Sequence, residues 1–335
     1  MPLGVREVVA VLSRARCARS DVAARTAISR WATTRAVAEQ LSRVSPLDAV
    51  VVMGTELYDV GRVIPERIPW VTFDDATVVQ QNRDPGSDVR QARVPAGILA
   101  RSTSYERAAA RSAALCCVTT QWAGRSVVED YGVPAEKVVV VGMGHRPRIA
   151  GEDRDWSAPR YLFVGADWER KNGAAVLRAF ERVRARVPAA SLDLVGNHPP
   201  VNTPGVTTHG FLTREDTAAQ VLLDRLYATA TCFVLPSLYD AAGIAYLEAA
   251  SSGLPVVATT RGGAPEVLGD GALAVDPHDR AALFEAMLTL SDPATARTMG
   301  ERARHKASTS SWWHVAGRVL EALENRQRTA GSVTS

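Results

Sequence analysis

Short apolar runs alternate along the chain with longer segments in which apolar residues recur at helical spacing. The short runs end at Gly, Pro or polar residues, which is typical of buried strands. We expect strands at residues 48–53, 69–75, 114–120, 137–141, 160–164, 191–195, 206–209, 232–235, 255–258 and 272–275. Helices are expected at residues 23–41, 102–114, 121–131, 173–187, 216–230, 244–250, 280–291, 294–306 and 312–324. This alternation predicts an α/β fold with parallel sheets covered by helices.

The alternation is interrupted by one polar segment that contains Gly and Pro, at residues 151–159, which we interpret as a linker. It separates an N-terminal α/β domain at residues 1–150 from a second α/β domain at residues 160–308. A final amphipathic helix is expected within residues 309–327, followed by a tail at residues 328–335.

One strand–loop–helix–strand segment, residues 232–258, carries polar residues where a ligand can bind. Gly243 begins its helix, and a helix N-terminus presents unpaired N–H groups and a partial positive charge that suit a phosphate. Glu248 lies about 7 Å further along the helix axis, which is the reach from a diphosphate to an attached ribose. Asp240 lies on the loop, on the other side of the phosphates. The alternative is a packing helix whose polar residues face solvent.

A second loop carries adjacent cations at the start of a helix. The strand at residues 160–164 ends at Gly165, and Arg170 and Lys171 stand just before the helix expected at residues 173–187. Arginine offers a planar fork to phosphate oxygens and lysine offers a compact charge. Cations are unfavourable at a helix N-terminus, so an anion bound between them and the helix dipole would remove the conflict. Together the two loops predict a diphosphate clamp; a solvated charge pair is the alternative.

Polar residues also follow the strands of the N-terminal half. Parallel strands collect ligands at their carboxyl ends, and Asp75 lies at that end of the strand expected at residues 69–75. Glu56, Thr120 and His145 follow neighbouring strands in the same way. Together they favour a ligand-binding edge, although an aspartate in this position is also common as a turn or helix cap.

The composition narrows the class of protein. The 335 residues are 46% hydrophobic and 22% charged, which is an ordinary globular balance with enough chain for two domains. The formal net charge is +3 with no long basic run, so nucleic-acid binding gains no support. The sequence has no apolar stretch of membrane-spanning length and no signal-peptide pattern at its N-terminus. We therefore expect a reduced, cytoplasmic protein, with association to a membrane surface left open.

Motifs for several other chemistries are missing from the sequence. There is no Walker A pattern, no GxGxxG after the first strand, and no Ser or Cys nucleophile elbow. The histidines are scattered, and the 4 cysteines lack metal-ligand or disulfide spacing, so no metal site is indicated.

The second half of the chain contains a series of motifs in a recognisable order. They are Gly165-Ala-Asp-Trp-Glu-Arg-Lys-Asn-Gly, Leu194-Val-Gly, His209-Gly-Phe-Leu, Val234-Leu-Pro-Ser, Gly253-Leu-Pro-Val-Val-Ala and Gly262-Gly-Ala-Pro-Glu. With them the second half resembles the family 4 glycosyltransferases, which are retaining, nucleotide-sugar-dependent enzymes of the GT-B fold. The first half is similar to the acceptor domain of that family more loosely, through Phe73-Asp-Asp-Ala-Thr and Thr120-Gln-Trp-Ala.

The resemblance implies two Rossmann-like domains facing across a cleft, with the donor held by the second and the final helix crossing back to the first. It assigns the pyrophosphate to Arg170 and Lys171, the ribose to Glu248 and the donor sugar to Asp240. The remaining expected donor contacts are Gly165, the backbone of Ala242, Gly243 and Ile244 at the phosphates, and Leu212 and Asn197 at the base. Asp75 is the candidate contact of the first domain near the reacting carbon.

Two departures from the family pattern stand out. The family pairs two glutamates eight positions apart, and here the first is Asp240, which is one methylene shorter. The family also begins with a strand and a Gly-rich loop, and neither is evident before Val50. We expect the first domain to be shortened by these elements.

The resemblance predicts transfer of a hexosyl group from a UDP- or GDP-sugar to a hydroxyl of a sugar, lipid or small-molecule acceptor. No cofactor or obligatory metal is expected. Two alternatives stay open: a truncated nucleotide-sugar-binding relative without turnover, and a GT-B epimerase or phosphorylase.

Overall fold

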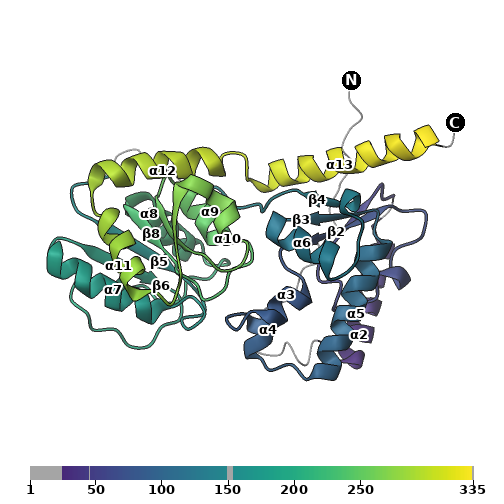
Figure 1. The fold of residues 1–335 in the computed structure, drawn as a ribbon, viewed down its shortest axis with the longest axis horizontal. Helices are drawn as coiled ribbons and strands as arrows, with labels where there is room; N and C mark the ends of the chain where they lie inside the picture. The colour runs from purple at the N-terminus through teal and green to yellow at the C-terminus, as the bar shows by residue number, and fades with distance from the viewer. Residues whose placement is uncertain (1–24, 45, 149–153, 334–335) are drawn as a thin grey trace. The chain divides into compact units, whose positions relative to one another are not determined.

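The computed structural model describes residues 25–44, 46–148 and 154–333, and these residues form two compact units. Unit 1 comprises residues up to Val141 together with Gly317 onward, and unit 2 comprises Gly142–Ala316. Each unit contains one parallel sheet with helices packed against it (Figure 1). The predicted α/β fold with two parallel-sheet units is therefore confirmed.

Unit 1 contains a four-stranded parallel sheet in which spatial order follows chain order, β1-β2-β3-β4. The strands are β1 (Val50–Val52), β2 (Trp70–Asp74), β3 (Leu115–Val118) and β4 (Val138–Val140). The helices of this unit are α2 (Ala27–Ser42), α3 (Val78–Arg83), α4 (Asp88–Gln91), α5 (Ala96–Ser112) and α6 (Gln121–Glu129), with 3-10 turns at Val60–Arg62 and Ala135–Lys137. The last helix, α13 (Trp312–Val333), belongs to unit 1 from Gly317 onward, where Arg318 Nε donates to the carbonyl of Val141 at 2.6 Å.

Unit 2 contains a six-stranded parallel sheet whose order departs from chain order, β10-β9-β8-β5-β6-β7. The strands are β5 (Arg160–Val164), β6 (Ser191–Val195), β7 (Val206–Thr208), β8 (Cys232–Val234), β9 (Val256–Thr259) and β10 (Ala272–Val275). The chain moves outward from β5 to β7 and then returns to place β8 on the other side of β5. Strands β5 and β8 therefore flank a topological switch point, which is where open α/β sheets form a crevice.

The helices of unit 2 cover both faces of this sheet. They are α7 (Gly173–Arg186), α8 (Thr217–Thr229), α9 (Ile244–Ser251), α10 (Ala264–Leu268), α11 (Arg280–Thr289) and α12 (Pro293–Ala307), with a 3-10 turn at Gly269–Gly271. Helix α7 packs with α11, and α9 packs with α12 on the other face (Figure 1). The centre of the sheet is apolar throughout: Tyr161, Leu162 and Phe163 of β5 are fully buried, which explains the continuous apolar run in the sequence.

Several helices differ from the sequence-based prediction. The helix expected at residues 102–114 begins earlier, at Ala96, immediately after Pro95, and the last helix continues past residue 324 to Val333. Helices α3, α4 and α10 were not predicted because each is only four to six residues long. A sequence signal for α3 was nevertheless present, since Thr77 and Gln80 form a reciprocal capping box. The first described strand is β1. The expected lack of a strand and a Gly-rich loop before it concerns mainly residues 1–24, which lie outside the described residues, so it stays a prediction.

Candidate functional site

The loop that leaves β5 is fixed in place by backbone contacts and close packing. The N–H of Gly165 donates to the carbonyl of Val195 at 2.9 Å, and a Cβ on Gly165 would lie 2.9 Å from Cγ of Lys171. Asn172 adopts a left-handed conformation at φ 59°, and its Nδ2 donates to the carbonyls of Pro236 at 3.2 Å and Pro277 at 2.8 Å. A non-glycine residue in this conformation costs free energy, so the surrounding bonds must hold it. The loop therefore presents Lys171 in a defined position.

Lys171 and Asp240 join the loops after β5 and β8, across the switch point. Lys171 Nζ lies 2.5 Å from Asp240 Oδ2, and the two side chains are only 13% and 11% exposed. The same carboxylate accepts the N–H of Gly243 at 3.0 Å and the hydroxyl of Ser237 at 3.3 Å. Burial alone would raise the pKa of Asp240, but Lys171 and, less strongly, Arg170 and the Gly243 N–H lower it below the usual value. Asp240 is thus held ionised.

Helix α9 begins where the sequence predicts, at Gly243, which adopts a left-handed conformation at φ 60°. A Cβ there would lie 2.0 Å from the ring of Tyr246, so only glycine fits this turn. Ala242 is buried and Ile244 is partly exposed. Because the Gly243 N–H is taken by Asp240, the donors without an intrahelical acceptor at this end of α9 are those of Ile244 and Ala245.

A cavity of about 390 Å³ opens in unit 2 beside these loops. Three of the predicted donor contacts line it: Gly165, Leu212 and Glu248. The lining residues that were not predicted include Arg148, Phe211, Arg214 and Gln220.

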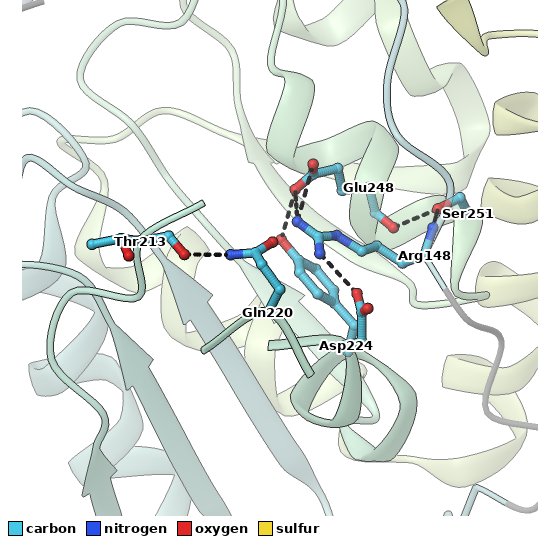
Figure 2. Close-up of polar contacts among 7 residues, drawn as sticks. Arg148, Thr213, Gln220, Asp224, Glu248 and Ser251 are labelled. Carbon is cyan, nitrogen blue, oxygen red and sulfur yellow. Dashed lines mark hydrogen bonds and ion pairs between the residues drawn. The ribbon is translucent and has the colours of Figure 1, made fainter. Parts of the chain in front are cut away.

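Glu248 contacts an arginine from far along the chain (Figure 2). Nη2 of Arg148 lies 3.2 Å from each carboxylate oxygen of Glu248, and Nη1 lies 2.7 Å from Oδ1 of Asp224 on α8. Burial alone would lower the pKa of Arg148, but Glu248 and Asp224 raise it above the usual value. Arg148 is separated from Glu248 by 100 residues, and no local pattern in the sequence marks it.

The remaining predicted residues lie outside this cavity. Arg170 Nη1 donates to the carbonyl of Tyr239 at 3.4 Å, and its Nε lies 4.0 Å from Asp167. Asn197 is exposed and donates to the carbonyl of Ala166 at 3.2 Å. Asp75 belongs to unit 1, where it is exposed just beyond the carboxyl end of β2.

Asp74, the neighbour of Asp75 on β2, was not predicted as a site residue. Burial is the main cause that raises its pKa to about 7, and the charges of Glu56 and Asp75 act in the same direction. These causes bring the pKa of Asp74, at this edge of unit 1, close to neutral pH.

Among the described residues, no group of three or more His, Cys, Asp and Glu side chains is placed to hold a metal ion; the expected independence of metal stays a prediction. No described helix has the length and apolarity needed to cross a membrane.

The sheet order and the helices on both faces define unit 2 as a doubly wound parallel α/β unit. A model of the family glycosyl transferases group 1 matches residues 158–292, a range that contains the whole six-stranded sheet. Residues 158–292 are therefore a glycosyl transferases group 1 domain. The resemblance found in the sequence is thereby confirmed.

Two curated relatives share this part of the chain. The GDP-mannose-dependent alpha-(1-6)-phosphatidylinositol monomannoside mannosyltransferase of Mycolicibacterium smegmatis is 36% identical over 176 residues, which cover 47% of this chain and 46% of that protein. The O-antigen chain mannosyltransferase B of Escherichia coli is 27% identical over 233 residues, or 64% of this chain and 61% of that protein. The chain thus matches about half the length of these relatives.

Solved structures match a larger part of the chain. A sucrose-phosphate synthase from Thermosynechococcus elongatus has a TM-score of 0.68 at 20% identity, covering 91% of this chain and 80% of that one. WaaG, a glycosyltransferase involved in lipopolysaccharide biosynthesis, has a TM-score of 0.63 at 19% identity and covers 89% of this chain and 83% of that one. At this level of identity the likeness concerns the fold, and it confirms the predicted GT-B class.

Proposed function

We propose that the chain is a retaining glycosyltransferase that moves a hexosyl group from a nucleotide-diphosphate sugar to an acceptor hydroxyl. The observation that carries the proposal is the placement of Lys171 and Asp240 across the switch point of a glycosyl transferases group 1 domain, beside the cavity lined by Glu248. This arrangement combines a cation, a helix N-terminus and a carboxylate, which are the groups that bind the diphosphate and ribose of a nucleotide.

The nucleotide would extend along α9. The diphosphate would lie near Arg170, Lys171 and the N–H groups of Ile244 and Ala245, where opposite charge and unpaired donors meet. Glu248, about 7 Å further along the helix, would accept the ribose hydroxyls. Leu212 and Gly165 would offer a flat, uncharged wall to the base and the adjoining atoms.

The reaction needs stabilisation of the leaving diphosphate. As the bond between the anomeric carbon and the phosphate oxygen breaks, negative charge grows on that oxygen, and Arg170, Lys171 and the dipole of α9 would stabilise it. The acceptor hydroxyl would attack from the face that the diphosphate leaves, with a phosphate oxygen taking its proton. Asp240, held ionised by Lys171, would orient the sugar, and Asp75 is the proposed unit 1 contact.

Calorimetric titration with GDP, UDP and ADP, and with the corresponding sugar nucleotides, tests the proposal. We expect one nucleoside diphosphate to bind clearly more tightly than the others. GDP is the first to try, because the M. smegmatis relative is a GDP-mannose-dependent enzyme. If none binds, the proposal is wrong.

Two substitutions then locate the nucleotide. Glu248→Ala should weaken binding by about 1–3 kcal/mol because the ribose hydroxyls lose a charged acceptor. Arg170→Ala should weaken binding of the diphosphate far more than binding of the nucleoside. Equal losses for the two ligands would instead indicate damage to the fold.

The alternative is a nucleotide-sugar-binding protein without turnover, and binding alone does not separate the two. Incubation with the sugar nucleotide that binds, followed by assay for release of the nucleoside diphosphate in the presence of candidate acceptors, decides between them. Cytoplasmic location and contact with a membrane surface stay predictions of the sequence.

A further inference from the structure

Arg148 reaches the wall of the nucleotide cavity from the segment that precedes unit 2's first strand. Its side chain is 5% exposed, yet it lines the cavity together with Glu248. Its backbone N–H donates to the hydroxyl of Ser251 at 2.9 Å, and that hydroxyl donates to the carbonyl of Glu248 at 2.7 Å. Both the main chain and the side chain of Arg148 are therefore attached to α9 close to Glu248.

The hydrogen bonds of Glu248 leave room for a ligand. One nitrogen of Arg148 contacts both carboxylate oxygens at 3.2 Å, and the hydroxyl of Tyr227 lies 3.5 Å from Oε2. A carboxylate offers about four acceptor positions, and Glu248 lines the cavity. The carboxylate can therefore accept further donors from the cavity while Arg148 stays in place.

The charges around Arg148 fix its position. Asp224 accepts a hydrogen bond from its other terminal nitrogen at 2.7 Å (Figure 2). The guanidinium carbon of Arg148 lies 5.2 Å from the centre of the Tyr227 ring. One cation thus separates two partly buried carboxylates, Asp224 and Glu248, whose side chains are 20% and 14% exposed. Without the cation the two carboxylates would repel each other and Glu248 would lose its orientation.

We propose that Arg148 is a positioning residue that holds the Glu248 carboxylate toward the 2′- and 3′-hydroxyls of the nucleotide ribose, and so makes the site selective for ribonucleotides. This inference rests on the proposed function, because it assumes a nucleoside diphosphate in the cavity. A buried ion pair adds little to stability compared with apolar packing of the same volume. The position of the Arg148–Glu248 ion pair at a ligand cavity is better explained if Arg148 orients the Glu248 carboxylate toward the ligand.

The test compares two ligands on each protein: GDP and 2′,3′-dideoxy-GDP, or UDP and its dideoxy analogue if wild type binds UDP more tightly. The wild-type protein should bind the ribonucleotide at least about tenfold more tightly, because the hydroxyls bond to a charged acceptor. In Arg148→Gln this ratio should fall to within about threefold, although Glu248 is still present. A general loss of folding lowers both affinities and leaves the ratio unchanged, so the ratio reports on orientation.

Four further variants sharpen the test. Glu248→Gln should also lower the ratio, and Arg148→Lys, which keeps the charge, should retain part of it. The matched control is Arg225→Gln on α8, next to Asp224 in the chain but outside the cavity lining, which should keep the wild-type ratio. If Arg148→Gln does not fold, Arg148→Lys and Asp224→Asn carry the comparison, and both should lower the ratio.

An unchanged ratio in a folded Arg148→Gln protein would overturn this inference alone. Tighter binding of GDP by that variant would also overturn it and would show that Arg148 blocks the site. Equal wild-type affinity for the two ligands would remove Glu248 from the ribose, and the inference with it, while leaving transferase activity to be assayed. Absence of binding by any nucleoside diphosphate would sink the proposed function and this inference together.

Discussion

Carboxylates that follow the carboxyl ends of strands have their pKa shifted in opposite directions in the two units. In unit 2, Asp240 lies 2.5 Å from a lysine nitrogen, and its pKa is lowered despite burial. In unit 1, Asp74 is surrounded by Glu56 and Asp75, and burial and these charges raise its pKa to about 7. Glu106, buried on α5, has a pKa raised well above the usual value in the same way, since burial and the charges of Glu56 and Asp74 outweigh its bonds to Tyr131 and Val78.

The sheet order explains the difference. In unit 2 the order reverses between β5 and β8, so a loop rich in cations lies beside a loop that carries a carboxylate. The described strands of unit 1 follow chain order, and the neighbouring ends of β1 and β2 both carry acidic residues. One edge therefore pairs a buried carboxylate with a cation, whereas the other contains a carboxyl group able to exchange a proton near neutral pH.

The largest effect is expected from removing the negative charge in unit 2. Asp240→Asn leaves Lys171 buried without its carboxylate, which should lower the free energy of unfolding by about 3–5 kcal/mol. Urea unfolding at pH 7 measures the loss. The double variant with Lys171→Met should recover part of it, because no unpaired charge is left. A loss below about 1 kcal/mol for the single variant would mean that solvent or a neighbour replaces the pair.

A gain in stability is expected from the matching change in unit 1. Because the pKa of Asp74 rises from 3.8 to about 7 on folding, its contribution is complete below pH 3.8 and is lost as the pH rises to about 7. The Asp74→Asn variant cannot ionise at this position, so its free energy of unfolding relative to wild type should rise by about 2–4 kcal/mol from pH 4 to pH 8. Urea unfolding of both proteins across this range measures the difference. A constant difference would show that Asp74 keeps an ordinary pKa.

The fold was predictable because the strands of both sheets correspond to continuous apolar runs in the sequence. Strands β5, β6 and β10 begin and end at the predicted residues, since each is an apolar run bounded by polar or turn residues. Helices of four to six residues, such as α4, were missed because they show too little periodicity. The order of strands in unit 2 could not be predicted from local sequence patterns, because none of them indicates on which side of β5 the strand β8 lies.

The candidate site was predictable where one loop carries its own signal. Gly165, Gly243 and Glu248 stand in motifs whose glycines and spacing have direct physical reasons, and Gly165 and Glu248 line the cavity. Arg148 and Asp74 were missed for different reasons. Arg148 contacts a partner 100 residues away, and the raised pKa of Asp74 arises from burial and from the charges of Glu56 and Asp75.

A smaller difference in stability is expected between replacing a glycine that neighbouring side chains crowd and replacing one that has free space around it. A Cβ on Gly165 would press on Lys171 at 2.9 Å and on Phe163 at 3.1 Å, so Gly165→Ala should cost about 1–2 kcal/mol and displace the lysine. The matched control is Gly97→Ala in α5, where a Cβ meets nothing within 4 Å and should stabilise by about 0.5 kcal/mol. Thermal unfolding measures both. Equal shifts for the two variants would contradict the crowding seen around Gly165.

The smallest effect concerns Asp130, a carboxylate of unit 1 that contacts a cation. Its two oxygens lie 2.6 and 2.9 Å from Arg83, and the Ser126 hydroxyl donates to it. Burial acts against these bonds, but together they lower its pKa. Unlike Lys171, however, Arg83 is 65% exposed, and Asp130 stands at the C-terminal end of α6, where a negative charge is unfavourable.

Asp130→Asn should therefore cost only about 0.5 kcal/mol at pH 7, and 1 M NaCl should remove most of that loss by screening. Because the pKa is lowered on folding, the contribution is present above pH 3.8 and disappears as the pH falls below it, so the variant and wild type should converge near pH 3. Urea unfolding at the two pH values and two salt concentrations measures this. Equal losses in the free energy of unfolding for Asp130→Asn and Asp240→Asn would mean that contact with a cation alone determines the loss. A smaller loss for Asp130→Asn would mean that burial of both partners distinguishes the site of unit 2.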